Sequence, residues 1–259
     1  MGHKFFLGSV LPPLKVGIEP PLLFEDLLIL FRENLKPSEM KKVRAIRLLL
    51  DLKNVEALVK KAPIDPRGNL TEKELDEALV NQETLPPYLF ELLDNYETAA
   101  EQLAHFEKVY VIFFKEMEES HQGFLRWYFS FERDWRIILA GYRAKKLGGD
   151  LLKALQYENP SHPLVAQVIA QKDAPFFEFP FEYADLGEKI EEVRGDPMEQ
   201  YLAMAKYRFK KVEEKVQDHP FAIDLSLGYM VMLMIVEDAY ALDEKKGQEN
   251  LNEVVKGNL

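Results

Sequence analysis

Acidic and histidine side chains at helical spacing are the first residues of this chain that could hold a metal ion. Glu118 and His121 form a Glu-x-x-His pair, which is the spacing that di-iron helical bundles use. Such a bundle needs a second pair and further glutamates, but no glutamate stands three residues before His105, His162 or His219. The pattern therefore favours a solvated polar helix end, and we expect neither a metal ion nor another cofactor.

Oxygen-bearing side chains around Gly68 form a second candidate metal site. In a calcium-binding EF-hand loop the sixth position is glycine. With Gly68 at that position, the loop would begin at Pro63 and would put Arg67 among the ligands. Thr71 and Glu74 have the spacing of a capping box instead. We therefore expect a loop followed by the start of a helix.

Signatures of nucleotide binding and of nucleophilic catalysis are missing from the sequence. The chain has no cysteine, no glycine-rich phosphate loop and no Gly-x-Ser-x-Gly elbow. Its 44 acidic residues include many neighbouring pairs, which are typical of a solvated face. We therefore expect a protein that is not an enzyme. A helical enzyme or small-ligand binder is an alternative, which a deep pocket with converging polar groups would favour.

The strongest pattern in the chain predicts a helix over residues 124–147. Its apolar residues recur at helical spacing and form one stripe: Phe131, Trp135, Ile138, Leu139 and Tyr142. We expect this stripe to face the core. Glu132 precedes Arg136 by four residues, which is the order that favours an ion pair on one helix. We therefore expect these two side chains to approach each other.

The predicted helix ends in a cluster of cations. Arg143, Lys145 and Lys146 occupy its last turn before Gly148. The carbonyl end of a helix favours positive charge, and glycine favours a stop. A solvated helix end is the ordinary interpretation. In a chain with a net charge of −11, these residues are also the best candidates for an electrostatic contact with a partner protein.

The order of residues in this helix resembles the recurring helix motif of the C/d family of V-type ATPase subunits. An acidic residue is followed by Trp-Arg, an apolar run and Arg-Ala-Lys-Lys-Leu-Gly. Residues 24–60 and 220–242 are similar to the same family. Residues 5–12 resemble a bacterial branch, associated with V-type ATPases and described as a domain of unknown function. The chain departs from the pattern at Arg136, where many relatives have asparagine, and it has no arginine one or two turns after Glu237.

The resemblance implies a non-catalytic rotor subunit. The family forms the helical cap between the central stalk of the ATPase and the membrane rotor ring, so both would be partners. The chain would pass torque between them in a V-type ATPase or ATP synthase. It would be cytoplasmic and would reach the membrane through its complex. A free-standing helical adaptor, unrelated to the ATPase, is another alternative, which the absence of co-purifying ATPase subunits would favour.

Composition sets further limits on function. The 259 residues are 47% hydrophobic, which is enough for a real core. The acidic balance argues against nucleic acid as a partner, because phosphate binding needs a cationic surface. The longest apolar runs, residues 109–114 and 225–236, are shorter than the roughly 20 residues that cross a bilayer. We therefore expect no direct membrane span.

Helical periodicity and helix caps predict an all-α fold, with the whole chain 1–259 as a single domain. Helices are expected at residues 25–34, 40–61 after an N-cap at Ser38, 86–117, 197–216 after Asp196, 220–242 and 248–255. The family resemblance implies three pseudo-repeated helical units near residues 20–80, 85–155 and 160–242. Alternating aromatic residues predict one extended segment near residues 176–183, packed over the helices or serving as a docking strip for a partner.

Overall fold

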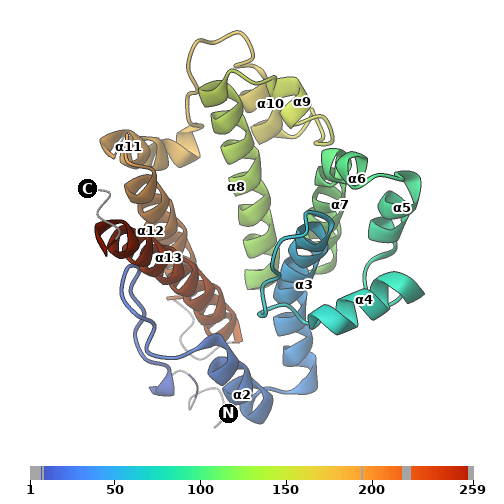
Figure 1. Ribbon diagram of the computed structural model, residues 1–259, viewed down its shortest axis with the longest axis vertical. Coiled ribbons are helices and arrows are strands. Elements are labelled where there is room, and N and C mark those ends of the chain that lie inside the picture. Colours follow the sequence, from blue (N-terminus) through green and yellow to red (C-terminus); the bar gives the residue numbers. More distant parts are fainter. Residues whose placement is uncertain (1–6, 8, 194, 218–222, 256–259) are drawn as a thin grey trace. The chain divides into compact units, whose positions relative to one another are not determined.

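The computed structural model describes residues 7, 9–193, 195–217 and 223–255, and it describes their side chains as far as residue 242. The described chain is 72% helical, with 12 α-helices and no strand (Figure 1). This helix content is about twice the roughly one-third that is usual in globular proteins. The predicted all-α fold class is therefore confirmed.

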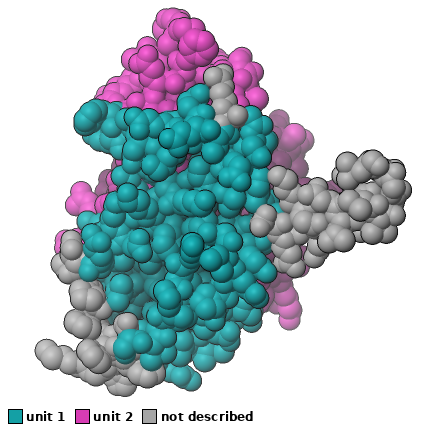
Figure 2. Space-filling view, turned by 90° about the vertical axis from the view of Figure 1, so that its left-hand side faces the viewer, with its two compact units in different colours: residues 1–40, 181–259 teal, residues 41–180 magenta. Residues whose placement is uncertain are grey.

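Two compact units make up the chain (Figure 2). The terminal unit consists of residues 1–40 and 181–259, and the middle unit consists of residues 41–180. These boundaries differ from the three predicted units near 20–80, 85–155 and 160–242, because both ends of the chain contribute to one unit. The threefold repeat itself stays a prediction.

The terminal unit is built around a pair of long helices, α12 (Pro197–Val216) and α13 (Ile223–Val255). The shorter helix α2 (Phe24–Asn34) packs against α13, and α11 (Ala184–Glu192) packs against α12. The side chain of Asp196 accepts hydrogen bonds from the first backbone N–H groups of α12, which are otherwise without partners in a helix. The predicted cap and both predicted ends of this helix are confirmed.

Helix α13 is the apolar core of the terminal unit. Every residue from Ser226 to Val236 is buried. Residues 223–242 are long and apolar enough to cross a membrane, and 67% of the apolar window is buried inside the protein. The sequence analysis was wrong to count this run as too short for a span. A core helix that is apolar all round passes the same test of length and composition.

The single helix α13 also replaces two predicted helices. Residues 220–242 and 248–255 were expected to be separate, but α13 is continuous to Val255. Gly247 lies between the two predicted helices, and an isolated glycine is tolerated within a helix. Pro220, where the first helix was expected to begin, lies outside the described residues.

The middle unit is organised around α7 (Glu107–Ser120) and α8 (Gly123–Leu147), which pack along each other. Helices α9 (Leu151–Ala154) and α10 (Pro163–Ile169) contact α8, and α5 (Pro87–Asn95) and α6 (Ala99–His105) contact α7 (Figure 1). The sequence predicted helix over residues 86–117, as one long helix or as two with a break, and the structure has three helices there. A capping box between Thr98 and Glu101 starts α6, and the sequence analysis missed it.

Helix α3 (Pro37–Val59) begins two residues earlier than an N-cap at Ser38 would allow. Ser38 lies inside the helix, so its prediction as the N-cap is wrong. Proline at the first helical position lacks only an N–H that would have no partner there. The side chain of Glu39 accepts a hydrogen bond from the backbone of Lys36 at 3.0 Å, which ties the chain down just before the helix.

Buried polar groups on α3 hold the loop that precedes α4 (Glu72–Asn81). Asp51 accepts hydrogen bonds from the side chain of Asn69 at 2.7 Å and from the backbone of Leu70 at 3.1 Å. Asp65 pairs with Arg67 at 2.6 Å. Asp65 and Asn69, two of the residues that gave this loop the composition of a calcium site, thus bind other side chains of the protein. The predicted capping box of Thr71 and Glu74 is present.

The aromatic segment is extended only in its first part. Phe177 and Phe179 pack edge to face at 5.1 Å between ring centroids, and Tyr142 of α8 contacts both rings. Phe181 instead begins a short 3-10 helix (Phe181–Tyr183) in the terminal unit and is 94% exposed. The predicted alternation therefore fails after Phe179, because a turn replaces the extended backbone.

Candidate functional site

The predicted apolar stripe of α8 is buried at Phe131, Trp135 and Ile138, whereas Leu139 and Tyr142 are only partly buried. Trp135 is 6% exposed and Phe131 is 7% exposed, and their ring centroids lie 6.3 Å apart. Ile138 is fully buried. The position of this stripe fixes which way the remaining faces of α8 point, including the face that carries its charged residues.

Charged residues on α8 reach across to α7. Arg136 donates to Glu107 at 2.7 Å and lies 3.9 Å above the centre of the Tyr110 ring. The sequence predicted an ion pair with Glu132 on the same helix. The structure shows Arg136 paired with Glu107 of α7, which offers a carboxylate beside the aromatic face of Tyr110, and an arginine gains from both. The approach of Glu132 to Arg136 stays a prediction. Tyr110 in turn donates to Glu56 of α3 at 2.5 Å.

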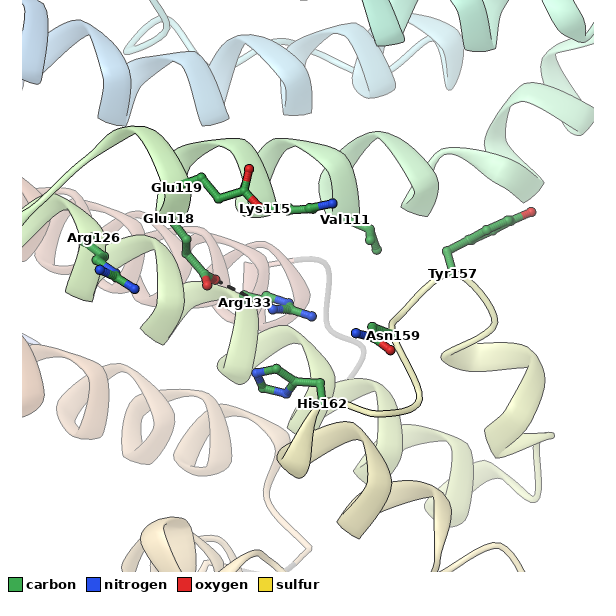
Figure 3. A pocket seen from close by; sticks show the side chains of 9 residues that line it. All are labelled: Val111, Lys115, Glu118, Glu119, Arg126, Arg133, Tyr157, Asn159 and His162. Atoms are coloured by element: carbon green, nitrogen blue, oxygen red, sulfur yellow. Dashed lines mark ion pairs between the residues drawn. The ribbon is translucent and has the colours of Figure 1, made fainter.

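A polar cleft of about 570 Å³ lies beside this contact, within the middle unit. Figure 3 shows the side chains that line it, which come from α7, from α8 and from the chain between α9 and α10. The lining residues are Val111, Lys115, Glu118, Glu119, Arg126, Arg133, Tyr157, Asn159 and His162. Six of these nine carry an ionisable acidic, basic or imidazole group, so the cleft is suited to a polar molecule rather than to an apolar one.

Arg133 is the fixed charge in this cleft. Its Nε and Nη2 groups donate to one carboxylate oxygen of Glu158, at 3.2 and 2.7 Å. Its Nη1 atom lies 3.9 Å from Oε1 of Glu118, the ion pair drawn in Figure 3. The Arg133 side chain is only 12% exposed and that of Glu158 only 7%. This largely buried pair also ties the α9–α10 connection to α8.

Two buried atoms of the lining have no hydrogen-bond partner, Oε1 of Glu118 and Nδ1 of His162. Burial raises the pKa of the Glu118 carboxyl, although Arg133 opposes the shift. Burial and then the charge of Arg133 lower the pKa of His162. Both effects favour the neutral imidazole of His162, and Glu118 and Glu158 oppose them. The cleft combines a neutral imidazole, a carboxyl with a raised pKa and fixed cations.

Glu118 and His121, the Glu-x-x-His residues of the sequence, have different surroundings. Nδ1 of His121 lies 2.9 Å from the Ser120 hydroxyl and 3.1 Å from the Met117 carbonyl oxygen. Glu118 lies in the cleft that His162 lines, and not with His121. Among the described residues, no group of three or more histidine, aspartate or glutamate side chains could hold a metal ion.

The basic end of α8 divides into two kinds of residue. Lys145 donates to the carbonyl oxygens of Lys172 at 2.6 Å and Ala174 at 2.8 Å, so it fastens the chain after α10. Arg143 and Lys146 are exposed. Sequence reasoning placed all three cations together as a partner contact, and two of them have the exposure that such a contact needs.

Apolar surface adjoins these two cations. Leu147 is 81% exposed and Leu152 of α9 is 47% exposed. A shallow groove of about 450 Å³ passes along the same end of α8 and is lined by Arg143, Leu147 and Tyr157 among others. Exposed apolar side chains next to cations are common at protein interfaces. No signal in the sequence marked the two leucines as exposed.

Comparison with known proteins places the chain in a family. The family model described as "Protein of unknown function (DUF2764)" matches residues 1–257, so the chain belongs to this family. A protein of Chlamydia muridarum (strain MoPn / Nigg) is 30% identical over 264 residues, which cover 99% of both chains. A protein of Chlamydia trachomatis serovar D is 30% identical over 265 residues, again covering 99% of both. A Chlamydia pneumoniae protein is 28% identical over 262 residues, covering 99% of this chain and 98% of its own.

Each of these three relatives carries the description "Uncharacterized protein". No solved structure matches the chain. The comparisons thus establish the family, and function has to be argued from the residues.

Proposed function

We propose that this protein is a non-catalytic subunit of a V-type ATPase or ATP synthase, the cap that links the central stalk to the membrane rotor ring. The observation that carries the proposal is the residue order of α8, which resembles the recurring helix motif of the C/d family of V-type ATPase subunits. The other two segments that share the resemblance, residues 24–60 and 220–242, contribute to α2, α3 and α13. A helical fold is what this role would use.

A rotor cap works mechanically. It would hold the stalk on one face and the ring on another, so that torque passes through its own body. Such a part needs helices that do not bend under load and surfaces that fit its partners, and it needs no reactive group. The fully buried side chains of α8 and α13 supply close packing of this kind, since well-packed interiors transmit strain. In this role the protein is cytoplasmic and peripheral to the membrane through its complex.

The basic end of α8 is the proposed contact with a partner protein of the stalk or ring. Arg143 and Lys146 are exposed cations beside the exposed Leu147. Cations at the rim of an interface steer association with an acidic partner, and apolar side chains supply area to bury.

Affinity purification of the tagged protein from its native cells tests this role. Stalk and ring subunits of a V-type ATPase are expected among the co-purifying chains, and the isolated protein is expected to hydrolyse no nucleotide. Binding to the isolated stalk should weaken as salt is raised, because screening acts on exposed charges. If wild-type protein retains no stalk or ring subunit, the rotor role is wrong and the free-standing adaptor remains.

A second candidate function is that of a small-ligand binder, and the polar cleft between α7 and α8 favours it. A pocket of about 570 Å³ falls within the roughly 300–1,000 Å³ of known ligand sites. Several polar groups converge on it from three segments of the chain. The two functions use different surfaces of the middle unit and can coexist.

A further inference from the structure

We propose that the cleft between α7 and α8 binds a small organic anion that also carries hydroxyl or amino groups. The proposal goes beyond the rotor role and does not depend on it. It rests on two unsatisfied buried atoms, on the cations around them and on the way the fold brings them together (Figure 3).

The unsatisfied atoms show that the cleft is built for an occupant. Oε1 of Glu118 and Nδ1 of His162 are buried without a hydrogen-bond partner, whereas nearly all buried polar atoms in proteins have one. A single ordered water needs about 30 Å³, and the cleft holds about 570 Å³. The space therefore suits a molecule with several polar groups of its own.

The carboxylates define one half of the ligand. Glu118 and Glu119 lie one after the other on α7 and both line the cleft. An ionised carboxylate only accepts hydrogen bonds, so a ligand group that meets the carboxylate of Glu118 or Glu119 in the cleft has to be a donor. Hydroxyl and amino groups meet this need. The neutral His162 can accept from a second donor, or donate to an acceptor, depending on its tautomer.

The cations define the other half. Arg133 is already neutralised by Glu158 at 2.7 Å, but Arg126 and Lys115 make no ion pair within the described part of the chain and are exposed at the cleft. Arginine and lysine bind carboxylate and phosphate groups by charge-assisted hydrogen bonds. An anionic group of the ligand next to Arg126 or Lys115 therefore completes the site.

The sequence positions these groups on facing surfaces. Lys115, Glu118 and Glu119 are at i, i+3 and i+4 on α7, and Arg126 and Arg133 are at i and i+7 on α8. Residues with these spacings share one face of a helix. The Arg133–Glu158 pair then brings the α9–α10 connection, with His162 at its end, onto the same space.

Binding of simple probes to the full-length chain tests the site. The probes are glycerol 3-phosphate and glycerate, which combine hydroxyl donors with a phosphate or a carboxylate. Inorganic phosphate and glycerol serve as the matched halves. By isothermal titration calorimetry we expect at least one combined probe to bind about tenfold more tightly than either half, since each added charge-assisted hydrogen bond contributes on that scale. Which probe binds identifies phosphate or carboxylate as the anionic group.

Three variants locate the binding. Arg126→Gln and Glu118→Gln should each weaken the combined probe about tenfold. Lys153→Gln, which removes the same charge from the neighbouring groove, should leave the affinity unchanged. Thermal melts confirm that each variant is folded before its affinity is used.

Two results would overturn the proposal. One is the absence of binding by both combined probes at millimolar concentration, with the wild-type protein folded. The other is equal binding by wild type, Arg126→Gln and Glu118→Gln, which would place the ligand elsewhere. Neither result concerns the ATPase, since the isolated chain is used, so the rotor role stands or fails separately.

Discussion

Helices α8 and α13 are the longest helices of the middle and terminal units, and they differ in the kinds of side chain that they bury. Helix α13 buries aliphatic and methionine side chains on nearly every face from Leu227 to Val236. Helix α8 buries large aromatic residues on one stripe and directs arginines toward charged partners on α7 and the α9–α10 connection. Helix α13 is a core element from Ser226 to Val236, whereas α8 combines buried aromatic residues with charged residues that have partners on neighbouring segments.

The difference shows where a site can arise. An apolar helix face only has to be removed from water, and any apolar neighbour of the right shape and volume can pack against it. A buried arginine must be hydrogen-bonded and neutralised, because an unpaired buried charge is costly. Glu118 and Glu158, the partners of Arg133, are therefore held in defined places, and Arg133 and Glu118 both line the polar cleft. The proposed ligand site follows from this charge on α8.

The largest effect should come from truncating the aromatic stripe. Trp135→Ala removes a large side chain that is 6% exposed and should lower the free energy of unfolding by about 3–5 kcal/mol. Met230→Ala in α13 should cost about 2–3 kcal/mol, near the lower end of its class, because flexible methionine neighbours refill space. Denaturant unfolding of both variants measures the difference.

An exposed aromatic residue supplies the control for this comparison. Phe181→Ala removes a side chain that is 94% exposed, so its stability should change by less than about 0.5 kcal/mol. A Trp135→Ala variant as stable as Phe181→Ala would mean that the stripe of α8 contributes nothing to the core.

Two glycines offer a second comparison of the helices. A Cβ on Gly228 of α13 would lie 2.6 Å from the Val216 side chain, and a Cβ on Gly141 of α8 would lie 2.7 Å from both Phe177 and Val168. Val216 is fixed on α12, whereas Phe177 lies in an extended segment. We expect Gly228→Ala to cost about 1–3 kcal/mol. Gly141→Ala should cost less, because its closest contacts are shared between Val168 of α10 and the Phe177 ring, which can shift, whereas those of Gly228 are all with Val216.

Thermal melts of Gly228→Ala and Gly141→Ala measure which substitution lowers the stability more. If Gly141→Ala is the more damaging change, the aromatic segment is as rigidly held as α12. The contrast between a fixed and an adjustable neighbour would then be wrong.

Local signals in the sequence predicted the elements well. The capping box at Thr71, the Asp196 cap with Pro197 and the glycine stop after Leu147 all act within a few residues. The all-α class follows from these signals. Predicted helix ends were wrong where a local signal was overlooked, as at the Thr98 capping box, and where one continuous helix was divided, as between Leu242 and Gln248.

Tertiary partners could not be predicted in the same way. Glu107 is 29 residues from Arg136, and Glu158 is 25 residues from Arg133. Only the packing of α7 and of the α9–α10 connection against α8 brings these pairs together. For the same reason the cleft was missed, although Glu118 had been singled out for a different partner. The pairing of both chain ends in one unit likewise leaves no local trace.

A smaller effect should appear in the pH dependence of stability. Burial raises the pKa of Glu118 in the folded state. Below the pKa of the unfolded state, Glu118 is protonated in both states, so its ionisation does not change the free energy of unfolding. As pH rises from there through the folded pKa, the unfolded state loses its proton first, so the folded state loses stability. Glu118→Gln does not titrate, so its stability relative to wild type should rise between about pH 4 and pH 7.

Urea unfolding of wild type and Glu118→Gln across this pH range measures the effect. Glu74→Gln is the opposite control, because hydrogen bonds from Thr71 lower the pKa of Glu74. Its stability relative to wild type should fall as pH rises, from a small starting difference. Parallel pH profiles for wild type and Glu118→Gln would show that burial does not disfavour the Glu118 carboxylate.

The smallest effect on stability is expected at the basic end of α8, where function rather than packing is at stake. Arg143→Glu with Lys146→Glu changes two exposed side chains, so the free energy of unfolding should stay within about 0.5 kcal/mol of wild type. Lys145→Met should cost about 1 kcal/mol, because Lys145 donates to the carbonyls of Lys172 and Ala174.

For association with the stalk, the rotor role predicts the opposite ranking, with a larger effect of the double variant than of Lys145→Met. The double variant should associate more slowly, with a weaker dependence on salt, because reversed charge at an interface acts mainly on the association rate. Lys145→Met should associate nearly as wild type does. Stopped-flow or surface-plasmon measurements with the purified stalk separate the two cases, and a double variant that associates at the wild-type rate removes this end of α8 from the interface.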